Sequence, residues 1–270
     1  MFDIGYSKLP KYNTNMLILI DIGNTNTNWG IAKSIDDVRA SHTSKTTKSK
    51  TVLKKEFQKI VDMGNIDGIV IGSVVPDVCE IVVEVAKTIC DEQNIFVPHY
   101  EEFAEIMDMK IKPEIIKPGA DRLANAFALK KLYSLPACAI DVGTAITLEI
   151  VDKQGKFLGG AIAPGEKLQL KALQEYTSQL GAIKRLPKSV PAIGRTTAEA
   201  MAIGIKRGVP WGIIGMLSGA EEFLGQPLES IVVTGGGALP MCMFLEKIYE
   251  NAECDELLTL RGLACAWYEK

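Results

Sequence analysis

Residues 17–27 read LILIDIGNTNT, and residues 137–147 read ACAIDVGTAIT. Each stretch is an apolar run that ends in Asp and continues through an apolar residue and Gly into a Thr-bearing turn. A second apolar strand follows each turn, at 29–32 and 148–151. Such a turn exposes backbone N–H groups and hydroxyls that can surround a phosphate, and its carboxylate can hold a metal ion. The repeat therefore predicts two similar half-molecules that face each other across a phosphate.

The composition is that of a globular protein. The chain has 270 residues, of which 47% are hydrophobic and 23% charged, so it can bury the cores of two ordinary domains. The net charge of −3 argues against nucleic acid or an anionic membrane as the main partner. No apolar run approaches the roughly 18–20 residues that cross a bilayer. We therefore expect a cytoplasmic protein that binds neither nucleic acid nor membrane.

The six cysteines and two histidines limit the kinds of catalytic or metal site that the chain can form. The cysteines form no C-x-x-C pair, and neither His42 nor His99 lies in a motif. This pattern argues against a His-ligated metal site and against a Ser-His-Asp triad. An acid–base step in this protein is therefore expected to use a carboxylate.

The other segments alternate between predicted strands and helices, as in α/β domains. Buried strands are expected at 69–73 and 231–234 and a short strand at 94–97. Helices are expected at 53–61, 77–90, 121–133, 166–180, 196–224 and 257–267. The helix at 121–133 is expected to be amphipathic, and the five glycines within 204–219 predict close helix or backbone packing. Residues 1–15 are polar and unpatterned, and two prolines mark 112–118 as a linker. We therefore divide the chain into a flexible extension (1–15), an N-terminal half (16–117) and a C-terminal half (118–270).

The first turn occupies residues 21–28. Gly23 permits a tight bend that brings the backbone close to an anion, and the Asn and Thr side chains after it supply donors. Asp21 suits a hydrated Mg²⁺, because this ion keeps several waters and takes few carboxylates. The alternative is an ordinary hairpin turn, for which Asn, Gly and Thr are also favoured.

The second turn strengthens the phosphate hypothesis, because two unrelated hairpins are not expected to share Asp-x-Gly. A third element, residues 233–238 (VTGGGA), follows a strand, and its glycines could let a purine and ribose lie against the backbone. The sequence contains no Walker A motif and no G-x-G-x-x-G after a strand. The two turns and the distal Gly-rich turn resemble the nucleotide site of the actin–hexokinase–Hsp70 superfamily. This resemblance implies an α/β fold of two ribonuclease H-like (actin-like ATPase) domains related by internal duplication, with mixed sheets flanked by helices.

Residues 119–122 (GADR) open a predicted helix beside the linker. An Asp at this place can simply be favoured by the helix dipole. The functional interpretation makes Asp121 a general base toward a substrate hydroxyl. Arg122 would then bind a substrate oxygen, because its fork of donors suits a carboxylate or similar group.

Several motifs follow one another in the order typical of type III pantothenate kinases. They are DIGNTNT, SVVP at 73–76, GADR, DVGTAIT, LGGAIAPG at 158–165 and IGRTTAEAM at 193–201. The resemblance covers nearly all of residues 16–270. It implies ATP-dependent phosphorylation of pantothenate at its primary hydroxyl, which is the first step towards coenzyme A. It also implies a homodimer, Mg²⁺ and a monovalent cation, K⁺ or NH₄⁺.

The resemblance also implies roles for individual residues. Asp121 would be the catalytic proton acceptor, Asp141 would bind the monovalent cation and Asp21 would lie near Mg²⁺ through water. ATP would be bound by Asp21, Ile22, Gly23, Asn24, Thr25, Asn26, Thr27, Asn28 and Thr144. Pantothenate would be bound by Gly119, Ala120, Asp121, Arg122 and Thr197.

The chain departs from the family pattern before GADR, where Pro118 immediately precedes the motif, and in residues 1–15, which have no obvious counterpart. Many relatives carry a Tyr seven residues before the Gly of GADR as a substrate contact, whereas this chain has Lys112. Thr197 also has a structural alternative, since it could cap a helix with Glu199 close behind. Two other functions remain open at this point. One is a different small-molecule kinase or a phosphatase of the superfamily, and the other is a non-catalytic ATP-binding regulator.

Overall fold

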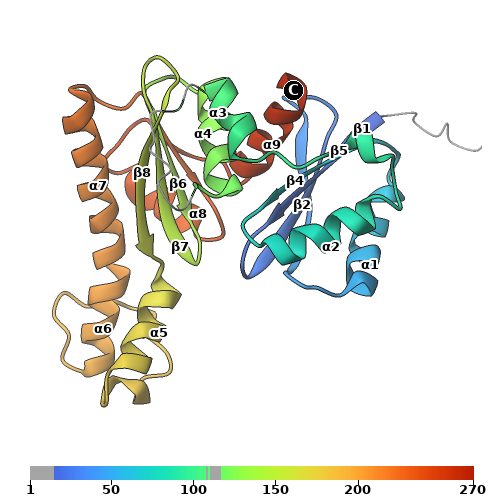
Figure 1. Ribbon diagram of the computed structural model, residues 1–270. Coiled ribbons are helices and arrows are strands. Elements are labelled where there is room, and N and C mark those ends of the chain that lie inside the picture. The colour runs from blue at the N-terminus through green and yellow to red at the C-terminus, as the bar shows by residue number, and fades with distance from the viewer. Residues whose placement is uncertain (1–14, 108, 110–116) are drawn as a thin grey trace, which may run out of the picture.

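The two halves of the chain are built on two five-stranded sheets (Figure 1). The computed structural model describes residues 15–107, 109 and 117–270. The first sheet consists of β1 (Asn15–Ile22), β2 (Asn26–Ala32), β3 (Val38–Lys45), β4 (Asn65–Ser73) and β5 (Ile95–Phe96). The second consists of β6 (Ala137–Val142), β7 (Ala145–Val151), β8 (Phe157–Pro164), β9 (Ser230–Thr234) and β10 (Ala252–Cys254).

The two sheets have the same topology. The strand order is β3-β2-β1-β4-β5 in the first and, read in the same sense, β8-β7-β6-β9-β10 in the second. In each sheet the first three strands form an antiparallel meander. The last two strands then add in parallel beside the first. The predicted α/β fold with mixed sheets is confirmed, and the shared strand order is what internal duplication would produce.

Helices cover the outer faces of both sheets. The bounds of the helices are α1 (Lys50–Val61), α2 (Pro76–Ala86), α3 (Tyr100–Met107), α4 (Ala120–Leu132), α5 (Glu166–Tyr176), α6 (Thr197–Lys206), α7 (Gly208–Leu224), α8 (Ala238–Leu245) and α9 (Leu258–Glu269). Alternation along β1 sends Ile18 and Ile20 into the core beneath α1 and α2, while Leu17 and Leu19 face the opposite side. Helices α7 and α8 cover the second sheet in the equivalent way.

Helices α4 and α9 pack together between the two sheets (Figure 1). The core around them includes residues of both halves, such as Leu19 and Val70 from the first and Ala139 and Val232 from the second. Seven consecutive residues of α4, 123–129, are buried. The predicted amphipathic character of this helix is therefore wrong, because α9, α3 and strands of both sheets surround it. Helix α9 also packs on β1 and β4, so the end of the chain returns to the first sheet.

The contact between α4 and α9 depends on Gly262. A Cβ atom at this position would lie 2.0 Å from the backbone oxygen of Ala124. We expect Gly262→Ala to lower the free energy of unfolding by about 1–3 kcal/mol, because α9 would have to move away from α4. Guanidinium unfolding should measure this loss. The control is Lys54→Ala at an exposed position of α1; it should change the free energy of unfolding by no more than about 0.5 kcal/mol.

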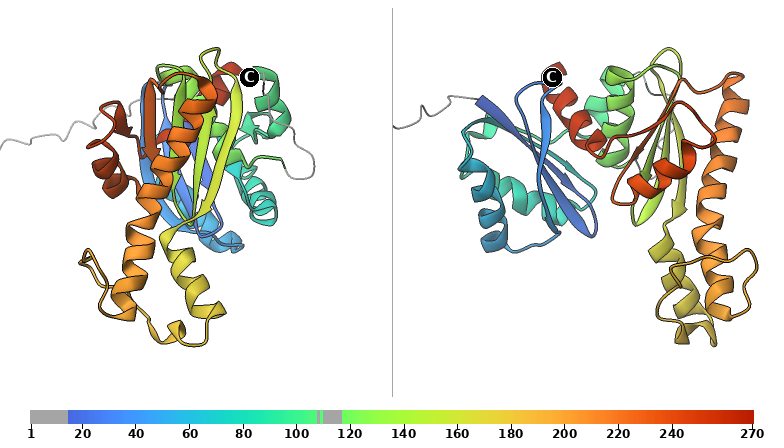
Figure 2. Two further views of the ribbon diagram at one scale, coloured as in Figure 1. Left: turned by 90° about the vertical axis from the view of Figure 1, so that its left-hand side faces the viewer. Right: turned by 180° about the vertical axis from the view of Figure 1, so that it is seen from behind.

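Helices α5 and α6 form an arm, residues 166–207, that projects beyond the second sheet (Figure 2). The predicted helix at 166–180 ends at Tyr176, and the predicted helix at 196–224 is divided at Arg207 into α6 and α7. The expectation that the glycines of this segment pack closely against another helix or backbone is wrong for a single chain. A Cβ at any of five positions would meet nothing within 4 Å: Gly204, Gly208, Gly212, Gly215 and Gly219.

Three sequence-based expectations lie outside the described residues in whole or in large part. They concern the extension 1–15, of which only Asn15 is described, the linker 112–118 and the substitution at Lys112. The division of the chain near residue 118 stays a prediction. Within the described ranges, no helix is long and apolar enough to span a membrane.

Candidate active site

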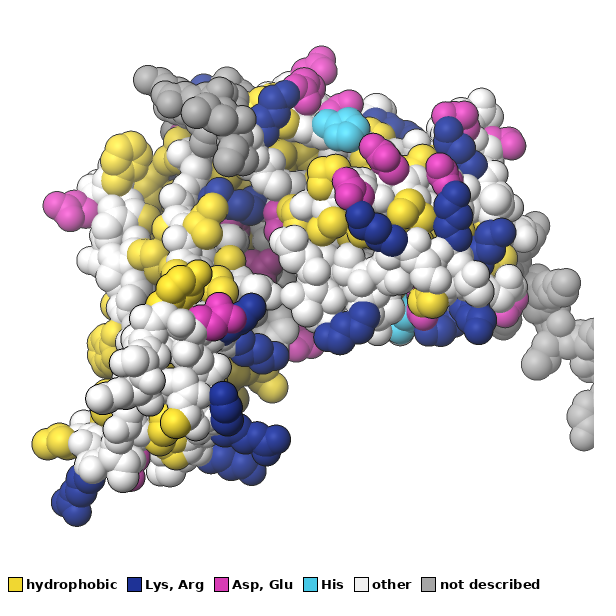
Figure 3. Space-filling view, turned by 60° about the horizontal axis from the view of Figure 1, so that its bottom comes forward, with side chains coloured by type: hydrophobic (Ala, Val, Ile, Leu, Met, Phe, Trp, Pro, Cys, Tyr) yellow, Lys and Arg dark blue, Asp and Glu magenta, His cyan; other side chains and the backbone are white. Residues whose placement is uncertain are grey.

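The tips of the two repeated hairpins meet. The hydroxyl oxygens of Thr25 and Thr144 are 3.4 Å apart, although 119 positions separate these residues in the sequence. Both tips lie at the lower edges of their sheets in Figure 1. Seen from that side, the surface is hollowed between the halves, and acidic side chains lie inside the hollow (Figure 3). The repeat thus builds one shared site.

The first turn is held in shape by backbone contacts and by Thr46. The Gly23 N–H donates to the Asn26 carbonyl at 3.0 Å, and the Thr46 hydroxyl donates to the Gly23 carbonyl at 2.6 Å. The Thr46 N–H donates to the Thr25 carbonyl at 3.1 Å. Asn24, Thr25 and Asn26 remain exposed at the tip. These three residues are therefore accessible to a ligand, although the Asn26 amide oxygen already accepts a hydrogen bond from Lys45 Nζ at 3.0 Å.

The other residues of the first turn play different parts. The side chain of Ile22 is completely buried in the core, and Thr27 is 2% exposed with its hydroxyl 3.2 Å from that of Thr46. These two residues could reach a ligand only through the backbone. Asp21 and Asn28 face each other across the β1–β2 ladder, and Asn28 Nδ2 donates to Asp21 Oδ2 at 3.0 Å. Asn28 thus fixes the Asp21 carboxylate.

The second turn lies against the Gly-rich turn that precedes α8. Gly235 has a φ of +87°, and a Cβ there would lie 2.2 Å from Asp141 Oδ1. The Gly237 N–H donates to the Val142 carbonyl at 2.8 Å. Unlike Asp21, the Asp141 carboxylate has no hydrogen-bond partner among the described residues. Thr144 is exposed at the tip.

Residues 119–122 form the N-cap and the first three positions of α4. The Asp121 carboxylate accepts a hydrogen bond from the Arg122 N–H at 2.8 Å. Gly119 is required here, since a Cβ would lie 2.5 Å from Asp121 Oδ1 and 2.7 Å from Val74. The Val74 N–H in turn donates to the Ile22 carbonyl at 3.1 Å. The SVVP segment therefore sets the start of α4 beside the first turn.

Three carboxylates converge on this site. Burial raises the pKa of Asp21 to about 6, with a further contribution from the charge of Asp121. Burial, together with the charges of Asp21 and Asp121, raises the pKa of Asp141 to about 7. Burial also raises the pKa of Asp121, against the opposing effect of Arg122. The mutual repulsion of these groups would be relieved by bound cations.

The three carboxylates fit cations whose remaining ligands come from a bound nucleotide and water. No group of three or more His, Cys, Asp and Glu side chains in the described part of the chain could hold a metal ion by itself. A divalent ion at Asp21 would therefore take its other oxygens from phosphates and water, as Mg²⁺ commonly does. The unpartnered carboxylate of Asp141 offers a second position for a cation.

Thr197 is not brought to this site within one chain. It is the exposed first residue of α6, which packs on α5 and α7 in the arm. In Figures 1 and 2 this helix lies far from the start of α4. The capping role considered for Thr197 belongs to Thr196, whose hydroxyl accepts from the Glu199 N–H at 3.2 Å in a complete capping box.

Sequence reasoning missed two residues that shape the site. Thr46 clamps the first turn, but its Ser, Thr and Lys-rich surroundings gave no sign of this contact. Glu149 lies completely buried beside Arg122, with Arg122 Nε 2.8 Å from Glu149 Oε1. A charged residue in a strand that is apolar apart from Thr147 was the signal available for Glu149.

Comparison with known proteins identifies the family. The family model for type III pantothenate kinase matches residues 17–220. The chain belongs to the type III pantothenate kinase family. It is 35% identical over 259 residues to the type III pantothenate kinase of Rhodospirillum rubrum, covering 92% of this chain and 96% of that protein. The match extends beyond the two turns to the helices and strands that support them.

Solved structures confirm the fold of this family member. A protein from Campylobacter jejuni, described as a conserved putative Baf family transcriptional activator, is similar with a TM-score of 0.55 and 20% identity, covering 93% of this chain and 98% of that one. An activator of 2-hydroxyisocaproyl-CoA dehydratase from Clostridium difficile, with bound ADPNP, has a TM-score of 0.53 and 17% identity, covering 94% and 95%. At these identities the similarity shows the fold alone, which is the predicted actin-like ATPase fold.

Proposed function

We propose that this protein transfers the γ-phosphoryl group of ATP to the primary hydroxyl of pantothenate, the first step of coenzyme A biosynthesis. The observation that carries the proposal is the meeting of Thr25 and Thr144 beside three carboxylates in a member of this family. Phosphoryl transfer needs in-line positioning and cancellation of charge rather than covalent help from the protein. Two facing turns with donors at their tips supply that arrangement.

ATP would lie with its phosphates between the two turns. The exposed donors at the tip of the first turn and Thr144 of the second turn would contact the phosphates. Asp21, held by Asn28, would orient a water-coordinated Mg²⁺, which neutralises charge on the β- and γ-phosphates. The nucleoside would lie against the Gly-rich turn before α8, where a Cβ at Gly236 would meet nothing within 4 Å.

Asp121 would accept the proton of the attacking hydroxyl. The hydroxyl oxygen forms a bond to the γ-phosphorus, the bond to ADP breaks, and the proton passes to the Asp121 carboxylate. Its raised pKa makes it a better base than an exposed aspartate. Residues 119–122 would together bind pantothenate, with Arg122 directed at a substrate oxygen.

Asp141 would hold a monovalent cation, K⁺ or NH₄⁺. Its carboxylate has no hydrogen-bond partner in the described part of the chain, and it lies beside the second turn. A cation there would offset the charge that Asp141 shares with Asp21 and Asp121. The two copies of the turn would then bind different ions, which agrees with the hydrogen bond that only Asp21 receives.

The other functions considered are separable by a coupled assay that follows ADP release. Turnover should require ATP, Mg²⁺, pantothenate and K⁺ together, because the acceptor hydroxyl completes the site. ATP turnover without pantothenate would instead indicate a phosphatase or ATPase, and turnover with another alcohol would indicate a different kinase. ATP binding with no turnover under any condition would indicate a non-catalytic regulator.

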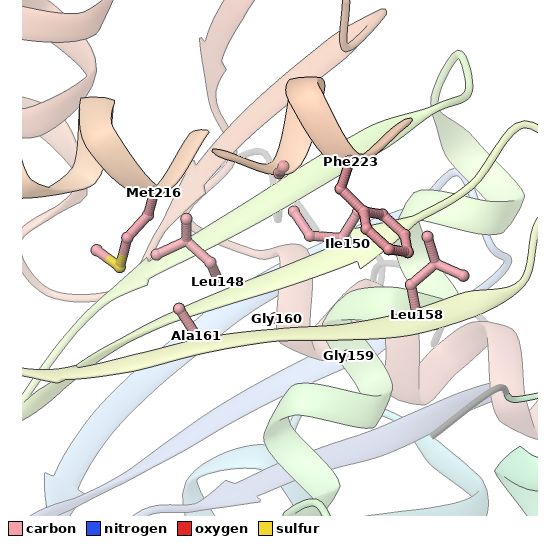
Figure 4. A pocket seen from close by; sticks show the side chains of 9 residues that line it. Leu148, Ile150, Leu158, Gly159, Gly160, Ala161, Met216 and Phe223 are labelled. Atoms are coloured by element: carbon pink, nitrogen blue, oxygen red, sulfur yellow. The ribbon is translucent and has the colours of Figure 1, made fainter. Parts of the chain in front are cut away.

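We infer that the active form is a homodimer joined through α7 and its surroundings. The open glycines of α7 run beside exposed apolar side chains, with Trp211 59% and Phe223 80% exposed. An apolar groove of about 320 Å³ lies between α7 and the β7–β8 hairpin (Figure 4). It is lined by Leu148, Ile150, Leu158, Gly159, Gly160, Ala161, Met216, Ala220 and Phe223. A second copy would cover this surface and could bring its own Thr197 to the pantothenate site.

Disrupting this face should separate the copies. We expect Gly215→Arg to convert a dimer to a monomer in sedimentation velocity experiments. The variant would place a long, charged side chain at an open position of the proposed dimer surface. The control is Met63→Arg, an exposed apolar position in the first half of the chain.

A second test mixes Asp121→Asn chains with Thr197→Ala chains. Regained turnover on mixing would support a Thr197 contributed by the partner copy, and no regain would contradict it.

A further inference from the structure

A buried ion pair joins the start of α4 to the middle of β7. Arg122 Nε donates to Glu149 Oε1 at 2.8 Å, and Arg122 Nη2 donates to the Leu148 carbonyl at 3.3 Å. Strand alternation sends Leu148 and Ile150 to the α7 face of the sheet and Glu149 to the α4 face. Glu149 is therefore the one acidic side chain that pairs with the Arg122 guanidinium among the described residues.

These contacts fix the Arg122 guanidinium through its Nε and Nη2 atoms. The Glu149 side chain is completely buried, whereas 15% of the Arg122 side chain is exposed. Nη1 has no partner within the described residues. Because the guanidinium is planar, holding it at Nε and Nη2 also sets the direction of the remaining donors. Arg122 directly follows Asp121 in α4, so these donors belong to the residue next to the proposed base.

The pair is an unfavourable way to join two elements. Removing two charges from water costs more than packing two apolar side chains of the same size, so a purely structural link would not need them. In addition, Glu149 Oε2 receives no hydrogen bond of good geometry among the described residues, and burial raises the pKa of Glu149 to about 8 although Arg122 and the Thr147 side chain oppose this rise, so the cost of desolvating the carboxylate is not fully compensated. Unfavourable arrangements of this kind persist where they serve a site.

We propose that Glu149 is a positioning residue for substrate binding, which orients Arg122 so that its free donors bind an oxygen of pantothenate, a carboxylate or a similar acceptor. The inference rests on the proposed function, because it takes Arg122 as a substrate contact. Glu149 itself touches no substrate. Its effect is carried through the guanidinium.

The test compares Michaelis constants for the two substrates. Glu149→Leu should raise the KM for pantothenate about 10-fold or more, as expected for the loss of a charge-assisted hydrogen bond, and leave the KM for ATP unchanged. Glu149→Gln keeps an acceptor for Arg122 Nε and should give a smaller increase. In an Arg122→Leu background, Glu149→Leu should add nothing further to the KM for pantothenate, because its effect passes through Arg122.

Glu56→Leu is the matched control. Glu56 is also mostly buried and paired, with His42 Nε2 at 2.7 Å, but it lies on α1 in the first half of the chain. This variant should leave both KM values unchanged. Equal changes in both KM values for Glu149→Leu, or effects that add to those of Arg122→Leu, would overturn the inference. If Glu149→Leu fails to fold, Glu149→Gln alone decides the outcome, and an unchanged KM for pantothenate in it contradicts the inference.

Failure of the inference is distinguishable from failure of the proposed function. Calorimetric titration of the wild-type protein with pantothenate, in the presence of a non-hydrolysable ATP analogue, comes first. No binding and no turnover would defeat the proposed function. Normal binding by wild type and by both Glu149 variants would defeat the positioning role alone.

Discussion

Asp121→Asn should lower kcat by about 10²–10⁴-fold, which is the usual contribution of a positioned general base. An amide at this position can still accept the hydrogen bond that the Arg122 N–H donates, so α4 should begin as before. It cannot accept the proton of the attacking hydroxyl. ATP affinity, measured by calorimetry, should stay close to that of wild type.

The pH profile gives an independent readout of the same residue. Burial raises the pKa of Asp121 above its ordinary value of 3.8, and only the ionised carboxylate can act as base. In wild type, kcat/KM for pantothenate should therefore fall as the pH is lowered through this raised pKa. At saturating Mg²⁺ and K⁺, which favour the ionised forms of Asp21 and Asp141, the limb should be missing in Asp121→Asn. The matched control is Asp77→Asn, an exposed aspartate in the first turn of α2 that pairs with Lys48. Near-normal turnover of the Asp121 variant would reject Asp121 as the base.

Asp21→Asn should lower kcat/KM for ATP by about 10²-fold or more, since a metal bound at a phosphate contributes several kcal/mol to the transition state. The amide oxygen of the substituted side chain could still accept from Asn28, which preserves the β1–β2 pairing. The negative charge that attracts Mg²⁺ would be lost. The measurement is initial rate against Mg²⁺ concentration at fixed ATP.

The variant should need far more Mg²⁺ to reach half of its maximal rate. Asp62→Asn serves as a control, because Asp62 lies at the exposed end of α1. If both variants show the Mg²⁺ dependence of wild type, Asp21 does not orient the metal. A selective change in the K⁺ dependence of Asp21→Asn would also contradict the assignment, because that ion is placed at Asp141.

The fold could be predicted from the sequence because the signal was repeated. The Asp-x-Gly turns at 21 and 141 each join an apolar strand to the next one, and their likeness implied two similar half-molecules, which the two sheets of equal topology bear out. The contact between Thr25 and Thr144 follows from that symmetry. Burial of α4 did not follow, because its alanines favour a helix without marking a particular face of it. The second sheet, α9 and α3 make them a core.

The glycines of α6 and α7 show a different limit of sequence reasoning. Their spacing indicates a face without side chains, but it does not say which surface covers that face. Within one chain, none of the described residues covers that face at these glycines. In the same way, IGRTTAEAM marks a functional segment, yet Thr197 stands on an arm away from Asp121. The proposed homodimer would account for both observations, and contacts between copies are not described by a sequence read as one folded chain.

The central claim is that the two turns transfer phosphate from ATP to pantothenate, and transfer of label tests it most directly. Wild-type protein is incubated with ATP labelled at the γ-phosphate, Mg²⁺, K⁺ and pantothenate, and the products are separated and identified by mass. We predict that label appears in 4′-phosphopantothenate in amounts equal to the ADP formed. Label appearing only as inorganic phosphate, with pantothenate recovered unchanged, would contradict the account.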